Sequence, residues 1–391
     1  MTALRITSKQ RRARLARRHL LATRSDDPVA VAGALVGLHA TDPASVLMSA
    51  TARMDPPDPS KLERALYEDR SLVRLLGMRR TVFVVPVDLA AVVQSAATAD
   101  IAVKERRRIV QLVVLAGVAD DPGAWLAALE GATLEALAAR GEATAAELVS
   151  DVPELGVQVE VNQGKNYAGK VGMSTQVLSL LAAEGRIIRG RPRGTWLSTL
   201  YRWAPSETWI PGGIPEIAVD DARTELARRW LAAFGPAHRG DLRWWTGWSA
   251  RNTAAALDGL DVLEVTLDTG PGLMLANDAE PEAPVEPWAA LLPALDPTTM
   301  GWSERSWYLG DHRPRLFDRS GNAGPTVWWE GRVVGGWAQR KDGEIAIRFL
   351  EEVPAEAVDA VAREADRVAG VLGPLRVTPR FGTPLERELI S

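Results

Sequence analysis

Histidine is the first side chain to consider for chemistry in this chain, because the sequence contains no cysteine. The missing thiols exclude disulfides, thiolate zinc sites and cysteine nucleophiles. The histidines His19, His39, His238 and His312 are widely scattered and none has the spacing of a metal-ligand motif, so we expect no metal site and no cofactor. Imidazole titrates near neutral pH, so a single histidine could still serve as a general base that holds a water molecule.

The segment that begins at His39 carries polar side chains close together in the sequence. Thr41 offers a hydroxyl and Asp42 a carboxylate, and we take His39, Thr41 and Asp42 as the catalytic candidates. An Asp followed by Pro43 is also the usual N-terminal cap of a helix, and His39 could pack at a helix end and cap a carbonyl group. Both interpretations stay open for these residues. Asp296, in LLPALDP, fits a simple Asp-Pro turn.

The net charge of −4 at pH 7 is only a weak argument against a nucleic-acid partner, because the charge is unevenly distributed. Residues 1–25 and residues 185–203 carry basic side chains and no acid, whereas acidic residues collect in 278–286. The N-terminal arginines could form a contact surface or one solvated face of a helix. The uneven distribution is compatible with binding to double-stranded DNA.

Several basic residues fall on predicted hairpins, where arginine would contact phosphate groups or the minor groove. An exposed, solvated hairpin is the alternative. Two lysines lie near the predicted start of a helix, whose N-terminus favours phosphate. The candidate DNA-contacting residues are Arg79, Arg80, Lys165, Lys170, Arg189, Arg191, Arg193, Arg340 and Lys341.

The elements that must position these residues follow a repeated order of three helices and a β-hairpin, which is the order of a winged helix. A chain of 391 residues with 46% apolar residues is expected to fold into about two to four domains. We expect an α+β fold with three tandem winged-helix (helix-turn-helix) domains and a small C-terminal β-rich or β-barrel domain. The expected domains are 1–118, 119–210, 211–280 and 288–391.

The clearest copy of this order lies between residues 120 and 203. Its expected elements are a helix that ends at Gly141, a helix that begins at a capping box with Thr144 as cap, a helix over 170–183 and a hairpin within 186–198. A second copy covers 221–276, and a third, looser copy covers about 5–86. All but one of the 14 tryptophans follow residue 195, and we expect them to pack in cores rather than stack on extruded bases.

Segments spread along the chain match a known pattern in the same order. They are GLHATDPASVLMSATARM (37–54), LVRLLGMRRTVFVVP (72–86), FGPAHRGDLRWWTGW (234–248), LLPALDP (291–297) and GPTVWWEGRVVGGW (324–337). The first is similar to the segment GLQAQDP…ARL of the AlkZ/YcaQ family of bacterial winged-helix DNA glycosylases. The sequence therefore resembles this family over nearly the entire chain.

The resemblance implies three tandem winged helices and a C-terminal β domain, with a concave face that holds duplex DNA. The family's catalytic triplet is Gln-x-Gln or Gln-x-Asp. Here His39 stands at the position of the first Gln, and Thr41 at that of the second Gln or the Asp. A family hairpin that corresponds to Arg340 and Lys341 is thought to probe the minor groove.

We therefore hypothesise a monofunctional DNA glycosylase that hydrolyses the N-glycosidic bond of alkylated or bulky-adduct nucleobases, in DNA repair or in self-resistance to a genotoxin. One alternative is a DNA-binding protein that kept the scaffold without the chemistry, as a lesion sensor or transcription regulator. Another is a scaffold for protein contacts. We expect double-stranded DNA as the partner, a monomer, no membrane contact and a cytoplasmic location at the bacterial nucleoid.

Overall fold

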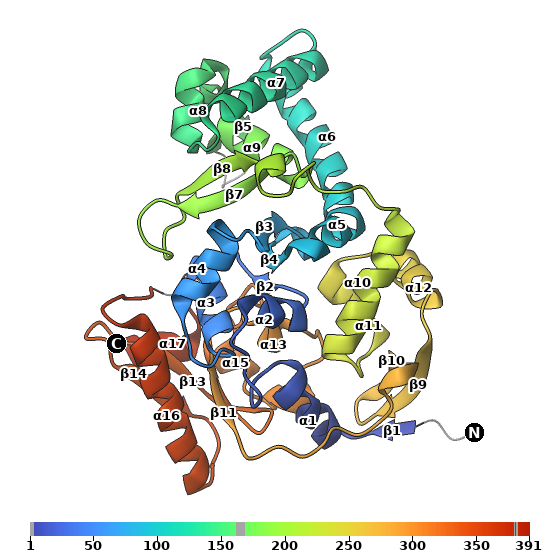
Figure 1. The fold of residues 1–391 in the computed structure, drawn as a ribbon, viewed down its shortest axis with the longest axis vertical. Coiled ribbons are helices and arrows are strands. Elements are labelled where there is room, and N and C mark those ends of the chain that lie inside the picture. The colour runs from blue at the N-terminus through green and yellow to red at the C-terminus, as the bar shows by residue number, and fades with distance from the viewer. Residues whose placement is uncertain (1–3, 162–168, 379, 381) are drawn as a thin grey trace. The chain divides into compact units, whose positions relative to one another are not determined.

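The computed structural model describes residues 4–161, 169–378, 380 and 382–391, so the candidate Lys165 lies outside the described residues. The chain forms two compact units, whose elements are labelled in Figure 1. Unit 1 comprises Met1–Leu72, Phe83–Pro86 and Arg223–Ser391, and unit 2 comprises Val73–Val82 and Val87–Ala222. Unit 1 therefore combines segments that are distant in the sequence, whereas unit 2 is interrupted only by Phe83–Pro86.

Unit 1 contains most of the helices and the larger sheets. Its helices are α1 (Ser8–Arg18), α2 (Pro28–Ala34), α3 (Pro43–Thr51), α4 (Pro59–Tyr67), α10 (Val219–Phe234, in unit 1 from Arg223 onward), α11 (Arg239–Thr246), α12 (Ala250–Asp258), α13 (Pro297–Met300), α14 (Ser306–Leu309), α15 (Arg313–Leu316), α16 (Ala355–Leu372) and α17 (Pro384–Ile390). Its strands are β1 (Leu4–Ile6), β2 (Leu38–His39), β4 (Val82–Pro86, in unit 1 from Phe83 onward), β9 (Val262–Leu267), β10 (Gly270–Leu275), β11 (Ala289–Leu292), β12 (Thr326–Trp329), β13 (Arg332–Gln339) and β14 (Ile345–Phe349).

The C-terminal part of unit 1 is built on an antiparallel sheet in the order β11-β12-β13-β14. The sheet ends at β11 and β14 and does not close, so the barrel form of the expected C-terminal domain is wrong. Helix α16 packs against β11 and α17 against β13. A second sheet has the order β1-β9-β10, in which β1 pairs parallel with β9.

The core of unit 1 is rich in aromatic rings. Trp302 contacts Phe234 edge-on with 5.1 Å between ring centroids, and Tyr308 stacks on Trp328 at 5.2 Å. Trp328 is 0% exposed and Trp302 is 1% exposed. Core packing of these tryptophans is therefore confirmed.

Unit 2 consists of helices around one apolar core, with two short hairpins. Its helices are α5 (Ala90–Val93), α6 (Ala99–Ala116), α7 (Pro122–Arg140), α8 (Ala145–Asp151) and α9 (Met173–Ala183). Its strands are β3 (Leu72–Leu76, in unit 2 from Val73 onward), β5 (Gln158–Val161), β6 (Gly169–Gly172), β7 (Ile187–Pro192) and β8 (Tyr201–Pro205). The core gathers buried side chains from α6, α7, α8 and α9, of which Leu126, Leu148 and Leu180 are 0% exposed.

Local signals predicted the helices of unit 2 well and its strands less well. The capping box that begins α8 is confirmed, since the Thr144 hydroxyl accepts from the Glu147 N–H and Glu147 accepts from the Thr144 N–H. The helix expected over 170–183 begins only at Met173, because residues 169–172 pair with β5 as strand β6. The hairpin expected within 186–198 is wrong in its second strand, which is β8 at 201–205.

The structure confirms the mixed α+β class, while the number of winged helices and their domain boundaries remain predictions. In the part of the chain that the structure describes, no helix combines the length and the apolar character needed to cross a bilayer. Within the same residues, no three His, Asp or Glu side chains are grouped so that they could hold a metal ion.

Candidate functional site

His39 lies at the end of β2, the short strand that leads toward α3. It is opposite Phe83 of β4, and the two ring centroids are 5.2 Å apart. The residue is buried, with 6% of its surface exposed. His39 therefore lies on a strand of unit 1. The alternative expectation, a histidine at the end of a helix, is wrong, because His39 belongs to β2.

Gly37 allows β2 to approach β4 this closely. Its φ of +123° is one that residues with a side chain rarely adopt. A Cβ atom at Gly37 would lie 2.8 Å from Val85 Cγ1 and 3.3 Å from the Val84 carbonyl oxygen. The glycine two residues before His39 thus helps to fix the position of the histidine.

Asp42 caps the helix that follows. Its carboxylate accepts a hydrogen bond of 3.2 Å from the Ala44 N–H at the start of α3, so the capping interpretation is confirmed. Burial raises the pKa of Asp42 above its ordinary value, although the Ala44 N–H and the Arg380 guanidinium act in the opposite direction. Asp42 thereby holds α3 against the segment that carries His39, and a catalytic role for it stays a prediction.

Two hydroxyl groups around this cap have no hydrogen-bond partner among the described residues. They are Thr41 Oγ1 and Ser45 Oγ, and both atoms are buried. The Thr41 backbone is held separately, because its carbonyl accepts from Arg380 Nη1 at 2.7 Å. Since buried polar atoms without partners are rare in folded proteins, these two hydroxyls call for an explanation such as a bound water or a functional role.

A small cavity of about 30 Å³ lies beside the N-terminal end of α3, with room for one or two water molecules. Glu386 of α17 lines it together with Asp42 and Ser45. The pKa of Glu386 is raised to about 7, mainly by burial and in part by the nearby Asp42 carboxylate, although the Thr383 N–H acts in the opposite direction. Sequence reasoning missed Glu386. Its capping box with Thr383 is a local signal, but the approach of α17 to Asp42 is not.

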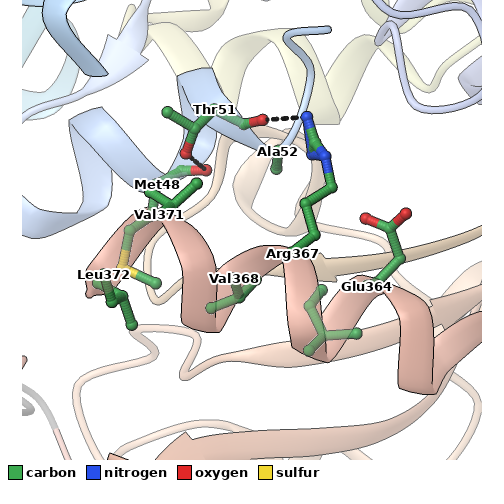
Figure 2. A pocket seen from close by; sticks show the side chains of 9 residues that line it. Met48, Thr51, Ala52, Glu364, Arg367, Val368, Val371 and Leu372 are labelled. Atoms are coloured by element: carbon green, nitrogen blue, oxygen red, sulfur yellow. Dashed lines mark hydrogen bonds between the residues drawn. The ribbon is translucent and has the colours of Figure 1, made fainter. Parts of the chain in front are cut away.

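The other end of α3 is held by α16, as Figure 2 shows. Arg367 of α16 donates to the Thr51 carbonyl at 2.8 Å and also to the Met54 carbonyl. The adjoining pocket has a volume of only about 10 Å³, which is too small for a substrate. Arg367 therefore satisfies carbonyl groups that the helix end leaves open.

A buried ion pair fixes α3 from a third side. Arg53 and Asp296 have 0% side-chain exposure, and Asp296 accepts from Arg53 through both carboxylate oxygens at 2.8 Å. Asp296 also accepts from the Ser49 hydroxyl and from the Thr298 N–H as the cap of α13. The expected Asp-Pro turn is therefore also a structural anchor.

His19 completes this network on the side of α1. Its Nδ1 lies 2.8 Å from Thr298 Oγ1, and its Nε2 lies 3.1 Å from the Ala233 carbonyl oxygen. The pKa of His19 is lowered to about 3, mainly by burial and in part by the nearby Arg53 charge. His19 is therefore neutral and structural rather than a site for acid–base chemistry.

Arg79 and Arg80 lie at the turn between β3 and β4, in unit 2. Both have positive φ, 53° and 61°, although neither is glycine. Arg80 is exposed and forms an ion pair with Glu105 of α6. Left-handed backbone at residues with side chains costs free energy and tends to occur at functional sites. Arg79 and Arg80 therefore remain candidates for contact with DNA.

The other candidates of unit 2 lie on its two hairpins. Arg189 is half-buried on β7, with its guanidinium 5.6 Å from the Tyr201 ring and 5.3 Å from the Trp203 ring. Arg191 and Arg193 are exposed on the same hairpin. Lys170 is exposed on β6, opposite Glu160 of β5, rather than at the start of a helix.

Arg340 and Lys341 are exposed at the turn between β13 and β14 of unit 1. Arg340 is held by two contacts, since it donates to Glu344 at 2.5 Å and to the Leu389 carbonyl at 3.1 Å. Lys341 accepts through its carbonyl from Arg376 Nε at 3.1 Å. The turn is thus fixed to the C-terminal residues while the Lys341 side chain remains exposed.

The arginines in the C-terminal half of α1 bind the acidic segment that the sequence separates from them. Arg14 pairs with Asp278 at 3.1 Å, Arg18 pairs with Glu282 at 2.8 Å, and Arg17 donates to the Pro284 carbonyl at 3.1 Å. Arg14 is 3% exposed. These three side chains form neither a solvated face nor an open basic surface, because acidic residues neutralise Arg14 and Arg18 and backbone carbonyls bind Arg17.

Sequence reasoning also missed Arg74 of β3, which is 6% exposed and lies over the Tyr201 ring at 4.5 Å. An arginine inside an apolar strand is a visible signal, because such a charge is seldom buried without a reason. The partner ring, however, lies more than a hundred residues further along the chain. Arg74 therefore could not be joined to a site from the sequence alone.

Comparison with known proteins finds a matching family and a solved structure with a similar fold. The sequence profile of the family described as "AlkZ-like: DNA glycosylase AlkZ-like" matches residues 32–371. Among solved structures, the fold is similar to that of the Streptomyces sahachiroi DNA glycosylase AlkZ, with a TM-score of 0.73 and 22% sequence identity over 96% of this chain and 100% of that chain. No curated protein matches in sequence. With 22% sequence identity, this match shows that the two proteins share a fold and shows nothing further.

Proposed function

Because this chain belongs to the AlkZ-like DNA glycosylase family, whose profile covers residues 32–371, we propose that it hydrolyses the N-glycosidic bond of alkylated or bulky-adduct nucleobases in double-stranded DNA. The products would be the free base and an abasic site, with the DNA strand left uncut. Such an activity would serve DNA repair or self-resistance to a genotoxin.

The observation that carries this proposal is the polar segment 39–45 inside unit 1. His39 is nearly buried on β2, and the Thr41 and Ser45 hydroxyls are buried without partners among the described residues. The Asp42 carboxylate accepts a hydrogen bond from the first turn of α3 and so helps to hold the segment in place. The segment thus offers an imidazole and two hydroxyls from a fixed backbone, which suits the positioning of one water molecule.

The reaction proceeds by attack of water on the sugar. The C1′–N bond breaks, its electron pair goes to the departing base, and the sugar passes through an oxocarbenium-like state. The water oxygen bonds to C1′ while neutral His39 accepts one of the water protons. The Thr41 hydroxyl orients the same water by a hydrogen bond.

The absence of a carboxylate or amide at the two triplet positions points to a particular class of lesion. Without an acidic residue at position 39 or 41, the site has no carboxylate of its own there to stabilise a sugar cation. A base that already carries a positive charge leaves with less assistance. We therefore propose cationic N-alkylpurines as better substrates than neutral adducts.

The contacts to DNA are proposed to come from the basic turns and hairpins. Arg80, Arg191, Arg193 and Lys341 are exposed and could reach phosphate groups, as could Lys170. Winged-helix modules would present these residues to the duplex, and the protein would act as a monomer at the nucleoid. Affinity should then fall linearly with the logarithm of salt concentration, with a slope of about −0.9 for each phosphate contacted.

The test is base release from a panel of duplexes that carry defined N7- or N3-alkylpurines. We expect the protein to release free base, detected by mass spectrometry, and to leave sites that break only after alkaline treatment. The same duplexes without lesions are the control. If no duplex in the panel loses a base while the protein still binds it, the alternative of a DNA-binding protein without glycosylase chemistry replaces this proposal.

A further inference from the structure

Unit 2 contains a cavity of about 80 Å³ that the residues 39–45 do not share. Its lining comes from β3, α9, β7 and Val82, the first residue of β4, and most of it is apolar. Two of the lining residues are arginines, Arg74 and Arg189, and none of the lining residues is acidic. A volume of this size has room for several water molecules or for a small polyatomic ion.

Arg74 is the residue in this cavity whose environment is incomplete. It is 6% exposed, and its Nε and Nη1 atoms are buried without a hydrogen-bond partner among the described residues. Its described contact is with the ring of Tyr201, over which the guanidinium lies at 4.5 Å. The stacking stabilises a cation but uses none of the N–H donors of the guanidinium.

The groups around Arg74 add further positive charge and a further hydrogen-bond donor. Arg189 brings a second guanidinium to the Tyr201 ring, at 5.6 Å, so two positive charges gather around one aromatic side chain. The Tyr201 hydroxyl is itself buried and has no hydrogen-bond partner in the described part of the chain. The site therefore concentrates donors and positive charge, and Arg74 itself has no ion-pair partner among the described residues.

A buried charge without a partner is unfavourable, because the guanidinium has lost its water and gained no anion in return. The planar fork of arginine donors matches the oxygens of phosphate well. From the cavity, the two arginines and the unpartnered donors, we infer that this site binds a phosphate group. The phosphate is either a free ion or part of the DNA backbone, and the second source rests on the proposed function.

The first experiment uses inorganic phosphate as the probe and the full chain as the protein. Thermal unfolding is followed at increasing phosphate concentration, with chloride added so that ionic strength is constant. A ligand that binds the folded state raises the unfolding temperature as its concentration exceeds the dissociation constant. We expect phosphate to raise the unfolding temperature of the wild-type protein by a few degrees beyond the chloride control.

The variant Arg74→Met keeps the length of the side chain and removes the charge and the donors. We expect it to lose the phosphate-dependent rise while it stays at least as stable as the wild type without phosphate, because an unpaired buried charge has been removed. Arg107→Met, at an exposed arginine of α6 outside the cavity lining, is the matched control and should keep the rise. Equal rises in the wild type and Arg74→Met, or no phosphate-specific rise in the wild type, would overturn the inference.

The second experiment identifies the source of the phosphate. Binding of a fluorescent duplex is compared between the wild type and Arg74→Met at one salt concentration. A loss of affinity of about tenfold in the variant, an amount typical for one charged hydrogen-bonding contact, assigns the site to a backbone phosphate. Unchanged duplex affinity together with a lost phosphate response assigns it to the free ion. If the wild type binds no duplex, the proposed function fails while the phosphate titration still decides this inference.

Discussion

At the scale of single residues, the buried pair of Arg53 and Asp296 in unit 1 has hydrogen-bond partners for both carboxylate oxygens. The carboxylate of Asp296 accepts from Arg53, from the Ser49 hydroxyl and from the Thr298 N–H, and both charged side chains have 0% exposure. A pair of this kind need not add stability compared with apolar residues, but the loss of one partner is costly. The network therefore matters because it orients α3 behind the His39 segment.

Asp296→Asn tests this view. The substitution leaves the Arg53 charge buried without its counter-charge, so the free energy of unfolding should fall by about 3–5 kcal/mol. Unfolding in urea measures the change. Glu225→Gln, at a partly exposed cluster with Arg228 and Arg229, is the control and should cost less than about 1 kcal/mol. A change in Asp296→Asn as small as that of the control would show that the pair is not a structural anchor.

Glu386 links stability to pH. Its pKa of about 7 in the folded protein lies above the ordinary value of 4.5, so between these values the folded state holds the proton more tightly than the unfolded state. The contribution of Glu386 to stability is thus largest below pH 4.5 and is lost as pH rises toward 7. The other ionisable groups that act on it are Asp42, which raises the pKa, and Arg387, which lowers it.

Glu386→Gln should remove this dependence. The variant should be more stable than the wild type at pH 8, and the difference should shrink as pH falls toward 4.5, with a slope of up to about 1.4 kcal/mol per pH unit. Urea unfolding at a series of pH values gives the two curves. Glu388→Gln, at an exposed residue of the same helix, should run parallel to the wild type. Parallel curves for Glu386→Gln would contradict the raised pKa.

At the scale of elements, the position of His39 depends on how closely β2 approaches β4. Gly37→Ala places a Cβ atom 2.8 Å from Val85 Cγ1 and forces a side chain onto a φ of +123°. We expect a loss of about 1–3 kcal/mol in the free energy of unfolding, from strained backbone. Gly131→Ala is the control, because Gly131 is inside α7 with nothing within 4 Å, and it should stabilise the protein by about 0.5–1 kcal/mol. A neutral Gly37→Ala would show that β2 has room to shift.

Elements that depend on neighbouring residues could be predicted from the sequence. The caps at Asp42 and Thr144 each begin a helix in the structure, because capping is a contact between residues two or three positions apart. Strands were harder, since pairing partners are not local. The return strand of the β7 hairpin lies beyond a longer loop than expected, and β1 pairs with β9 across most of the chain.

The candidate site was predictable in part for the same reason. His39, Thr41 and Asp42 could be chosen because they are adjacent in the sequence and because the segment resembles a known family. Glu386 and Arg74 could not be placed, since each is defined by a contact with a residue more than a hundred positions away. The role of Arg14 and Arg18 in α1 was also not predictable. The sequence shows the acidic segment 278–286, but it does not show that this segment pairs with these arginines.

At the scale of the whole molecule, charged side chains of both signs occur in the interior of the chain as well as on its surface. The net charge of −4 does not describe this arrangement, because Arg14 and Arg18 form ion pairs with Asp278 and Glu282. Exposed basic side chains remain on the turns of both units, at Arg80, Arg193 and Lys341 among others. Those residues, and not the N-terminal arginines, are the ones that should set the salt dependence of DNA binding.

The most direct test of the proposed site compares base release by the wild type and by His39→Ala under single-turnover conditions, with duplex affinity measured on the same substrate. Loss of a general base should slow release by about 10²–10⁴-fold, while affinity stays within a few-fold of the wild type. His312→Ala, at a histidine paired with Glu351, should release base at the wild-type rate. Release by His39→Ala at the wild-type rate would contradict the assignment of His39 to the reaction.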